Sequence, residues 1–256
     1  MIIYFSGTGN SLSMAKLLSR LLNEPILHIN AALQRYSKMD EAKIGIIFPV
    51  YCCDIPDPVA HFVEKMEFNP SAYIYGIATC GGDAGNALYS LSKLLTKKNL
   101  KLSYGREITM TDNCTPLISP PTVYYGSSIS NQKNLAEQIA SDISQNRIDT
   151  STISYGLKNT LTHAAISGFV LDKLLKKSVN YDLCVHCGTC QKICPQNNIK
   201  IEAGKIEFGK ACVQCLACVH WCPNAAIQLR GRTLSKSEQY HHPEITLKEM
   251  LKHNAP

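Results

Sequence analysis

Short apolar segments and longer amphipathic segments alternate over the first 150 residues. Apolar runs with strand character lie at 2–5, 26–29, 43–48, 72–79 and 106–110. Between them, apolar residues recur at helical spacing and predict helices over 11–22, 58–66, 83–96 and 129–145. Strands that alternate with helices predict parallel pairing. The expected fold is therefore α/β, with a doubly wound parallel sheet of five strands.

The pattern changes after a polar boundary at 146–151. Apolar residues then recur at steps of three and four, which predicts one helix with a single apolar face: Leu157, Leu161, Ala164, Gly168, Leu171 and Leu175. Three lysines close this helix: Lys173, Lys176 and Lys177. A basic amphipathic helix can lie on a membrane surface. The more ordinary expectation is a connector that packs its apolar face on its own domain.

The last third contains an internal repeat with an offset of 28 residues, and both copies spell C-x2-C-x2-C-x3-C-P. Three thiolates at this spacing surround one corner of a cubic cluster, and the fourth cysteine points to the other cluster. The spacing therefore assigns one [4Fe-4S] cluster to Cys184, Cys187, Cys190 and Cys222, and a second to Cys212, Cys215, Cys218 and Cys194. The alternative is a structural zinc site, which would use four cysteines and leave four matching ones unexplained.

Composition agrees with this division. The 256 residues are 45% hydrophobic and 18% charged, which suits a globular core and excludes a disordered chain. The sequence has no apolar run long enough for a membrane span and does not begin like a signal peptide. We therefore expect a cytoplasmic protein, in which dense cysteine indicates metal rather than disulfides.

Charge is also divided between the two parts. Residues 1–150 are neutral overall, and residues 151–256 carry the whole net charge of +6. Two oxidised clusters with their thiolates would add about −2 each, which leaves about +2. The lysines partly offset the cofactors, so no nucleic-acid partner is expected.

The segment SGTGNS, at 6–11, follows the first strand and opens the first helix. Its backbone N–H groups and hydroxyls form an anion site. It lacks the lysine of a Walker A loop, and Leu12 stands where a dinucleotide fingerprint needs a small residue. A glycine turn that binds nothing is the alternative. The segments FPVYCCDIP, at 48–56, and TCGGDAGN, at 79–86, follow two further strands, and ligands bind where such loops converge.

These three loops resemble those of flavodoxins, over residues 1–148, and residues 179–232 resemble the bacterial two-cluster ferredoxins. The whole chain is similar to the flavodoxin–ferredoxin fusion proteins of anaerobic bacteria, including its segments DNCTP, HWCPNAAI and YHHPEIT. The resemblance implies a linker helix at 149–178 and a tail at 233–256 that packs on the domains. It implies FMN at Ser6, Gly7, Thr8, Gly9, Asn10, Ser11, Pro49, Val50, Tyr51, Thr79, Cys80, Gly81 and Gly82.

One departure concerns the flavin ring, because Cys52, Cys53 and Asp54 stand where aromatic or glycine residues are expected. The tail also carries His241 and His242, for which packing over the ferredoxin domain is a more ordinary expectation than metal binding.

The expected function is a redox adapter that passes electrons between FMN and two [4Fe-4S] clusters. Its partner would be a redox protein, such as a ferredoxin or a reductase, or a small electron acceptor. The alternative is a reductase of a small acceptor such as a quinone, with Tyr51, Cys53 or Asp54 as proton donor. A third alternative is a redox sensor that uses Cys52 or Cys80.

Overall fold

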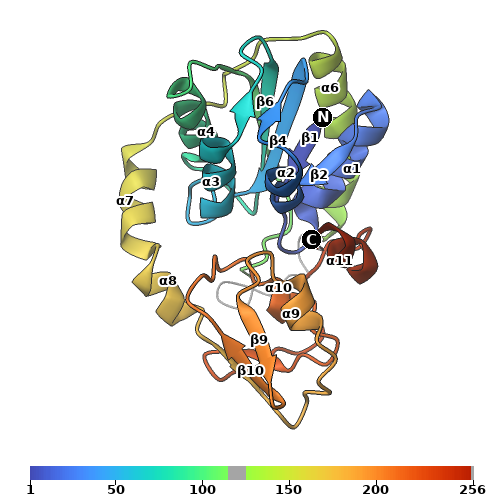
Figure 1. The fold of residues 1–256 in the computed structure, drawn as a ribbon, viewed down its shortest axis with the longest axis vertical. Helices are drawn as coiled ribbons and strands as arrows, with labels where there is room; N and C mark the ends of the chain where they lie inside the picture. The colour runs from blue at the N-terminus through green and yellow to red at the C-terminus, as the bar shows by residue number, and fades with distance from the viewer. Residues whose placement is uncertain (115–124, 255–256) are drawn as a thin grey trace.

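A five-stranded parallel sheet forms the centre of the N-terminal part of this computed structural model, which describes residues 1–114 and 125–254 (Figure 1). The strand order is β2-β1-β4-β6-β7, which is the flavodoxin-like order once two short strands outside the sheet are left out. The sheet strands are β1 (Ile2–Tyr4), β2 (Ile26–His28), β4 (Lys43–Pro49), β6 (Tyr73–Cys80) and β7 (Leu102–Thr109). The predicted doubly wound sheet is confirmed. The two short strands, β3 (Lys38–Met39) and β5 (Glu67–Phe68), pair with each other.

Helices cover both faces of the sheet (Figure 1). Helix α1 (Asn10–Leu22) packs with α6 (Tyr125–Ser144), whereas α3 (Asp57–Lys65) packs with α4 (Ala87–Thr96) and with α2 (Ile29–Arg35). The buried strands explain the continuous apolar runs, since a parallel sheet with two covered faces has no polar side. Helix α2 is not predicted by the sequence pattern. Helix α4 begins at residue 87 rather than 83, because Gly85 takes a left-handed φ of 59° before it.

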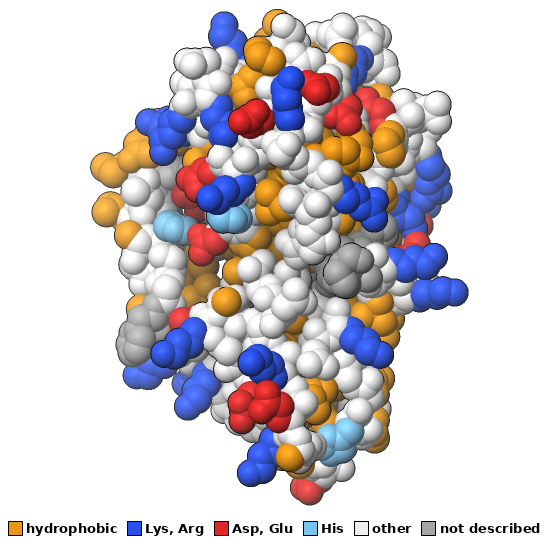
Figure 2. All heavy atoms as spheres, in the orientation of Figure 1, with side chains coloured by type: hydrophobic (Ala, Val, Ile, Leu, Met, Phe, Trp, Pro, Cys, Tyr) orange, Lys and Arg blue, Asp and Glu red, His pale blue; other side chains and the backbone are white. Residues whose placement is uncertain are grey.

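The linker differs from the prediction of one packed helix. It forms two helices, α7 (Leu157–Ile166) and α8 (Phe169–Leu174), which are separated at Gly168, where φ is 65°. Leu157 and Leu161 are 63% and 62% exposed, so the apolar face of α7 does not pack on its own domain. Figure 2 shows hydrophobic side chains at the surface along the left edge, where α7 lies in Figure 1.

The C-terminal part lies beyond the carboxyl ends of the sheet strands (Figure 1). It contains two antiparallel strand pairs and two short helices that each follow a cysteine loop: β8 (Lys177–Val179) with β11 (Ile227–Leu229), β9 (Ile199–Glu202) with β10 (Lys205–Phe208), α9 (Thr189–Ile193) and α10 (Ala217–His220). The chain then returns to the N-terminal part and ends in α11 (Leu247–Asn254), which contacts α2 and β2.

Candidate functional site

Two cavities in the C-terminal part divide the eight motif cysteines into two groups of four. One cavity is lined by Cys184, Cys187, Cys190 and Cys222, which we name the upstream set. The other is lined by Cys194, Cys212, Cys215 and Cys218, the downstream set. The structure therefore brings together three cysteines of one copy of the motif with the fourth of the other, as the crossed assignment expects.

The two cysteine loops have the same backbone conformation. His186 and Gly188 have φ of 53° and 72°, and their counterparts 28 residues later, Gln214 and Leu216, have φ of 55° and 57°. Left-handed residues at alternating positions turn the chain sharply, so that the cysteines on either side of each turn face one cavity. The sequence repeat is thus also a repeat of backbone conformation.

Backbone N–H groups point at the fourth cysteine of each copy. The amide of Asn198 donates to Cys194 Sγ at 3.4 Å, and the amide of Ala226, 28 residues later, donates to Cys222 Sγ at 3.2 Å. Lys177 Nζ also donates to Cys212 Sγ at 3.4 Å. Hydrogen bonds of this kind stabilise thiolates and tune the potential of an iron–sulfur cluster.

Burial makes the most enclosed of these cysteines poor thiolates on their own. It raises the pKa of Cys190 to about 11 and that of Cys215 to about 12. Cluster iron supplies the positive charge that such buried thiolates require, so the donor set fits the group. Across residues 1–114 and 125–254, no three His, Cys, Asp or Glu side chains converge as ligands of a single metal ion do. Cys187 of the upstream set is exposed, whereas Cys215 and Cys218 of the downstream set are buried.

The anion loop, residues 6–11, ends at the start of α1. Gly9 precedes this helix with φ of 100°, no side chain in the described part of the chain caps it, and its first turn has no acidic residue. The backbone N–H groups of Asn10, Ser11 and Leu12 have no carbonyl partner within the helix. Uncapped N–H groups at the positive end of a 13-residue helix fit a phosphate.

Three predicted loops and one further loop line a single cavity at the carboxyl edge of the sheet. The predicted residues that line it are Ser6, Gly7, Thr8, Asn10, Ser11, Pro49, Val50, Tyr51, Thr79, Cys80 and Gly81. Gly9 and Gly82 are not among them. The sequence-based selection missed Thr111, Asp112 and Asn113, which follow β7 and complete the wall. The only sequence signal for them is the segment DNCTP, whose last residues lie outside the described part of the chain.

Hydrogen bonds join these loops. Ser11 and Thr79 share a hydroxyl–hydroxyl bond of 2.8 Å, and Asn10 Nδ2 donates to the carbonyl of Thr111 at 2.9 Å. The side chains of the anion loop thus hold the neighbouring strand ends. In the described part of the chain, no side chain caps the backbone amides of the first turn of α1. A neutral loop with free amides suits a phosphate monoester that is held without a lysine.

The turn after β4 has a backbone conformation that glycine normally adopts. Tyr51 and Asp54 exchange two backbone hydrogen bonds of 3.0 Å, and Cys52 and Cys53 between them have φ of 49° and 61°. Two left-handed residues form a turn that glycine and asparagine favour. Burial raises the pKa of both thiols, and that of Cys80 to about 12, which does not suit a reactive sensor cysteine.

The anion loop is in direct contact with the downstream set. A Cβ atom at Gly7 would lie 2.5 Å from the carbonyl oxygen of Cys215 and 3.0 Å from the hydroxyl of Tyr51. The Tyr51 hydroxyl is buried and has no hydrogen-bond partner among the described residues, and burial raises the pKa of Tyr51 well above the usual range. The Trp221 indole donates to the carbonyl of Gly7 at 3.1 Å.

The C-terminal tail closes over the same loop. His242 donates its backbone N–H to the carbonyl of Thr8 at 2.8 Å, and the Tyr240 hydroxyl donates to Asn10 Oδ1 at 2.6 Å. His241 stacks on Trp221, with ring centroids 4.2 Å apart. His242 is fully buried and its Nε2 pairs with Gln132 Oε1 at 3.0 Å. The structure thus places both histidines in packing and hydrogen-bonding positions.

Comparison with known proteins identifies the C-terminal part. Residues 176–223 match the family described as the 4Fe-4S dicluster domain. This domain contains both cysteine sets, so the C-terminal part is an iron–sulfur domain of the ferredoxin type. No curated protein matches the chain. In the described part of the chain, the helices are too short or too polar to cross a membrane.

Solved structures resemble the N-terminal part at low identity. The flavodoxin of Fusobacterium nucleatum bound to flavin mononucleotide shares 10% identity at a TM-score of 0.39, over 57% of this chain and 96% of its own. The two-electron reduced flavodoxin of Megasphaera elsdenii shares 15% at 0.34, over 55% and 97%. The Trp repressor binding protein of Bacillus subtilis shares 12% at 0.39, over 56% and 96%. The strand order, rather than these likenesses, establishes the fold. The chain thus joins a flavodoxin-like fold to a ferredoxin-type domain, as the resemblance to flavodoxin–ferredoxin fusions predicts.

Proposed function

We propose that this chain is a redox adapter that exchanges electrons between an FMN at the anion loop and two [4Fe-4S] clusters at the two cysteine sets. FMN accepts or donates one or two electrons, whereas each cluster carries one. The observation that carries the proposal is the contact of Gly7 with Cys215. It brings the loop that would hold the flavin phosphate against the downstream set.

The contact also supports an order for the two sets. The downstream set adjoins the anion loop through Gly7, and its members Cys215 and Cys218 are buried. The upstream set has the exposed Cys187 and its exposed neighbour Val185. We therefore propose that the downstream cluster lies next to the flavin and that the upstream cluster lies farther from it.

Anaerobic reconstitution with iron, sulfide and FMN tests the proposal. We expect about eight iron atoms, about eight sulfides and about one FMN per chain. A limiting amount of a one-electron donor should then bleach flavin and cluster absorbance together. A chain that holds the clusters but takes up no FMN, or holds both without exchanging electrons, would contradict the adapter.

A second candidate, a reductase with its own small acceptor, is supported by a cavity of about 340 Å³ between the two parts. The cavity is lined by Tyr51 and Cys52, by Leu171 of α8 and by Cys212 of the downstream set. His163 lines it as well and donates from Nδ1 to the Cys52 carbonyl at 3.0 Å. The cavity thus lies between both proposed redox centres and contains a group able to move a proton.

Turnover separates the two candidates. The reductase would turn over a water-soluble quinone steadily without a carrier protein, and His163→Gln would lower its rate. The adapter would reduce a carrier protein alone, and His163→Gln would leave that rate unchanged. Asp54 has a structural role in the turn, where its Oδ1 accepts the backbone N–H of Ile55 at 2.7 Å.

A further inference from the structure

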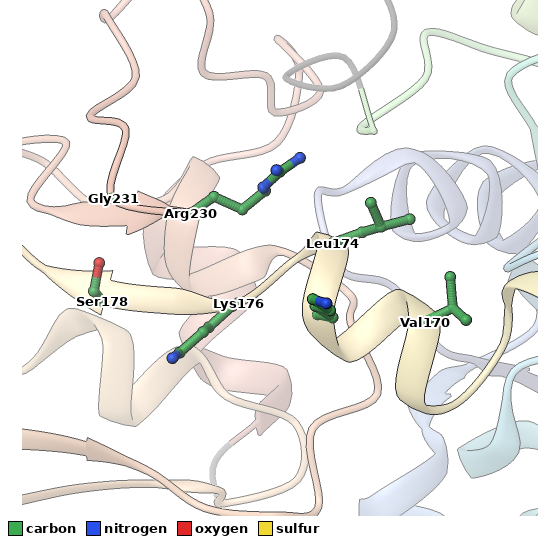
Figure 3. Close-up of a pocket in the computed structure, with 7 residues that line it drawn as sticks. Val170, Leu174, Lys176, Ser178, Arg230 and Gly231 are labelled. Atoms are coloured by element: carbon green, nitrogen blue, oxygen red, sulfur yellow. The ribbon is translucent and has the colours of Figure 1, made fainter.

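A groove of about 760 Å³ lies between α8 and the ends of β8 and β11, and it is larger than the cavities at the two cysteine sets (Figure 3). Figure 3 shows Val170 and Leu174 on α8, with Arg230 and Gly231 on the facing segment. Its lining residues are Val170, Lys173, Leu174, Lys176, Ser178, Arg230 and Gly231. The groove shares no lining residue with the cavity at the anion loop.

The groove has positive charge without an internal counterion. Lys173, Lys176 and Arg230 line it and are exposed. Within the described ranges none of these three forms an ion pair, and no lining residue is acidic. Their charge is therefore available to a molecule outside the chain. Val170, 42% exposed, adds an apolar contact among the cations.

The groove lies across one strand from the downstream set. The backbone N–H of Arg230 donates to the carbonyl of Lys176 at 2.8 Å. The next residue, Lys177, donates from Nζ to Cys212 Sγ at 3.4 Å. Lys177 therefore serves the cysteine set, while its neighbour Lys176 lines the groove on the outside. A molecule seated in the groove would be close to the downstream set.

We propose that this groove is the docking site of a small acidic electron-transfer protein, one that has carboxylates around its redox centre. This proposal rests on the function proposed above. Three unpaired cations beside an exposed valine match a patch of carboxylates with an apolar centre, and opposite charges speed the encounter of such partners. A small anion would use the cations but not Val170.

The test measures association between the reconstituted protein and a purified small ferredoxin of strongly negative net charge. Lys173→Glu/Lys176→Glu should weaken binding at low ionic strength by about tenfold or more. The matched control is Lys97→Glu/Lys101→Glu, which makes the same charge change at exposed positions near the amino end of β7. The control should bind like the unmodified protein, and Val170→Ser should weaken binding without changing its salt dependence.

Equal weakening by both double variants, or none by either, would overturn the docking site. Saturable binding of inorganic phosphate in the groove, with no binding of the ferredoxin, would also overturn it in favour of a small-anion site. Cofactor content and electron exchange within the chain are measured on the same variants. If docking fails while that exchange persists, the docking proposal is wrong and the adapter function is retained. If exchange is absent in the unmodified protein, the adapter function itself is wrong.

Discussion

The Trp221 indole Nε1–H donates to the carbonyl oxygen of Gly7 at 3.1 Å, and both groups are buried. Trp221 lies between Cys218 of the downstream set and Cys222 of the upstream set, whereas Gly7 belongs to the anion loop. One hydrogen bond therefore joins the segment that would bind both clusters to the loop that would bind the flavin phosphate.

Trp221→Phe should loosen the junction. The change leaves the buried Gly7 carbonyl without its donor, which costs about 1–3 kcal/mol. We expect a lower free energy of unfolding and weaker FMN binding, measured by denaturant titration and flavin fluorescence. His241→Ala is the control, because it removes only the ring stacked on Trp221, worth about 0.5–1.5 kcal/mol, and keeps the bond. Equal FMN affinity in the Phe variant and the unmodified protein would refute a role for this bond at the loop.

Gly7→Ala should separate the two parts. Its Cβ would meet the Cys215 backbone at 2.5 Å, and backbone cannot move aside as a flexible side chain does. We expect slower electron exchange between flavin and clusters, together with a loss of stability of about 1–3 kcal/mol. Gly82→Ala is the matched control, because no atom of the described residues lies within 4 Å of the added methyl group. If the two variants behave alike, the contact with Cys215 is not important for exchange.

Much of this molecule can be predicted from its sequence. The five sheet strands follow from continuous apolar runs, and the crossed grouping of the cysteines follows from a repeat of spacing and proline. Both signals are local in the sequence. Eleven of the thirteen residues selected for FMN line one cavity, because they lie at the carboxyl ends of parallel strands or in the segments that follow them.

The rest depends on contacts between distant segments. Treated as separate units, the two halves give no reason for Trp221 to bond Gly7 or for His242 to bond Thr8. The prediction of one continuous helix over the linker is wrong for a local reason. Its periodic pattern includes Gly168, which takes a positive φ and separates α7 from α8. Thr111 and Asn113 were missed because the segment after β7 has no glycine-rich pattern like that of the anion loop.

Cys53→Gly should stabilise the turn after β4. At φ of 61°, the left-handed backbone of Cys53 costs about 1–2 kcal/mol of strain. This exceeds the free-energy cost of the extra entropy that glycine would give the unfolded chain. We expect the free energy of unfolding to rise by about 0.5–1 kcal/mol. Cys53→Ser keeps the strain and should leave stability unchanged. A fall in stability with glycine would show that the thiol makes a contribution beyond the turn.

His242 should make stability depend on pH. Burial lowers the pKa of its imidazole to about 4, against 6.5 in the unfolded chain. Above pH 6.5 the imidazole is neutral in both the folded and the unfolded state, so it does not lower the free energy of unfolding there. As pH falls toward 4, the unfolded chain takes up a proton that the folded one does not, and on the order of 3 kcal/mol is lost.

Unfolding of the reconstituted protein between pH 7.5 and 5 measures this dependence. His242→Gln removes the titrating group. In that variant the slope of the free energy of unfolding against pH should therefore correspond to about one fewer proton taken up on unfolding. An unchanged slope would assign the pH dependence to other groups.

The central claim is that the downstream cluster is completed by Cys194 and lies next to the flavin. Cys194→Ala and Cys222→Ala, each reconstituted anaerobically with iron, sulfide and FMN, test it by spectroscopy and rapid reduction. We expect Cys194→Ala to damage the cluster of Cys212, Cys215 and Cys218 and to slow flavin reduction, whereas Cys222→Ala damages the other cluster. Damage to the cluster of each cysteine's own motif copy, or slower flavin reduction only in Cys222→Ala, would contradict the account.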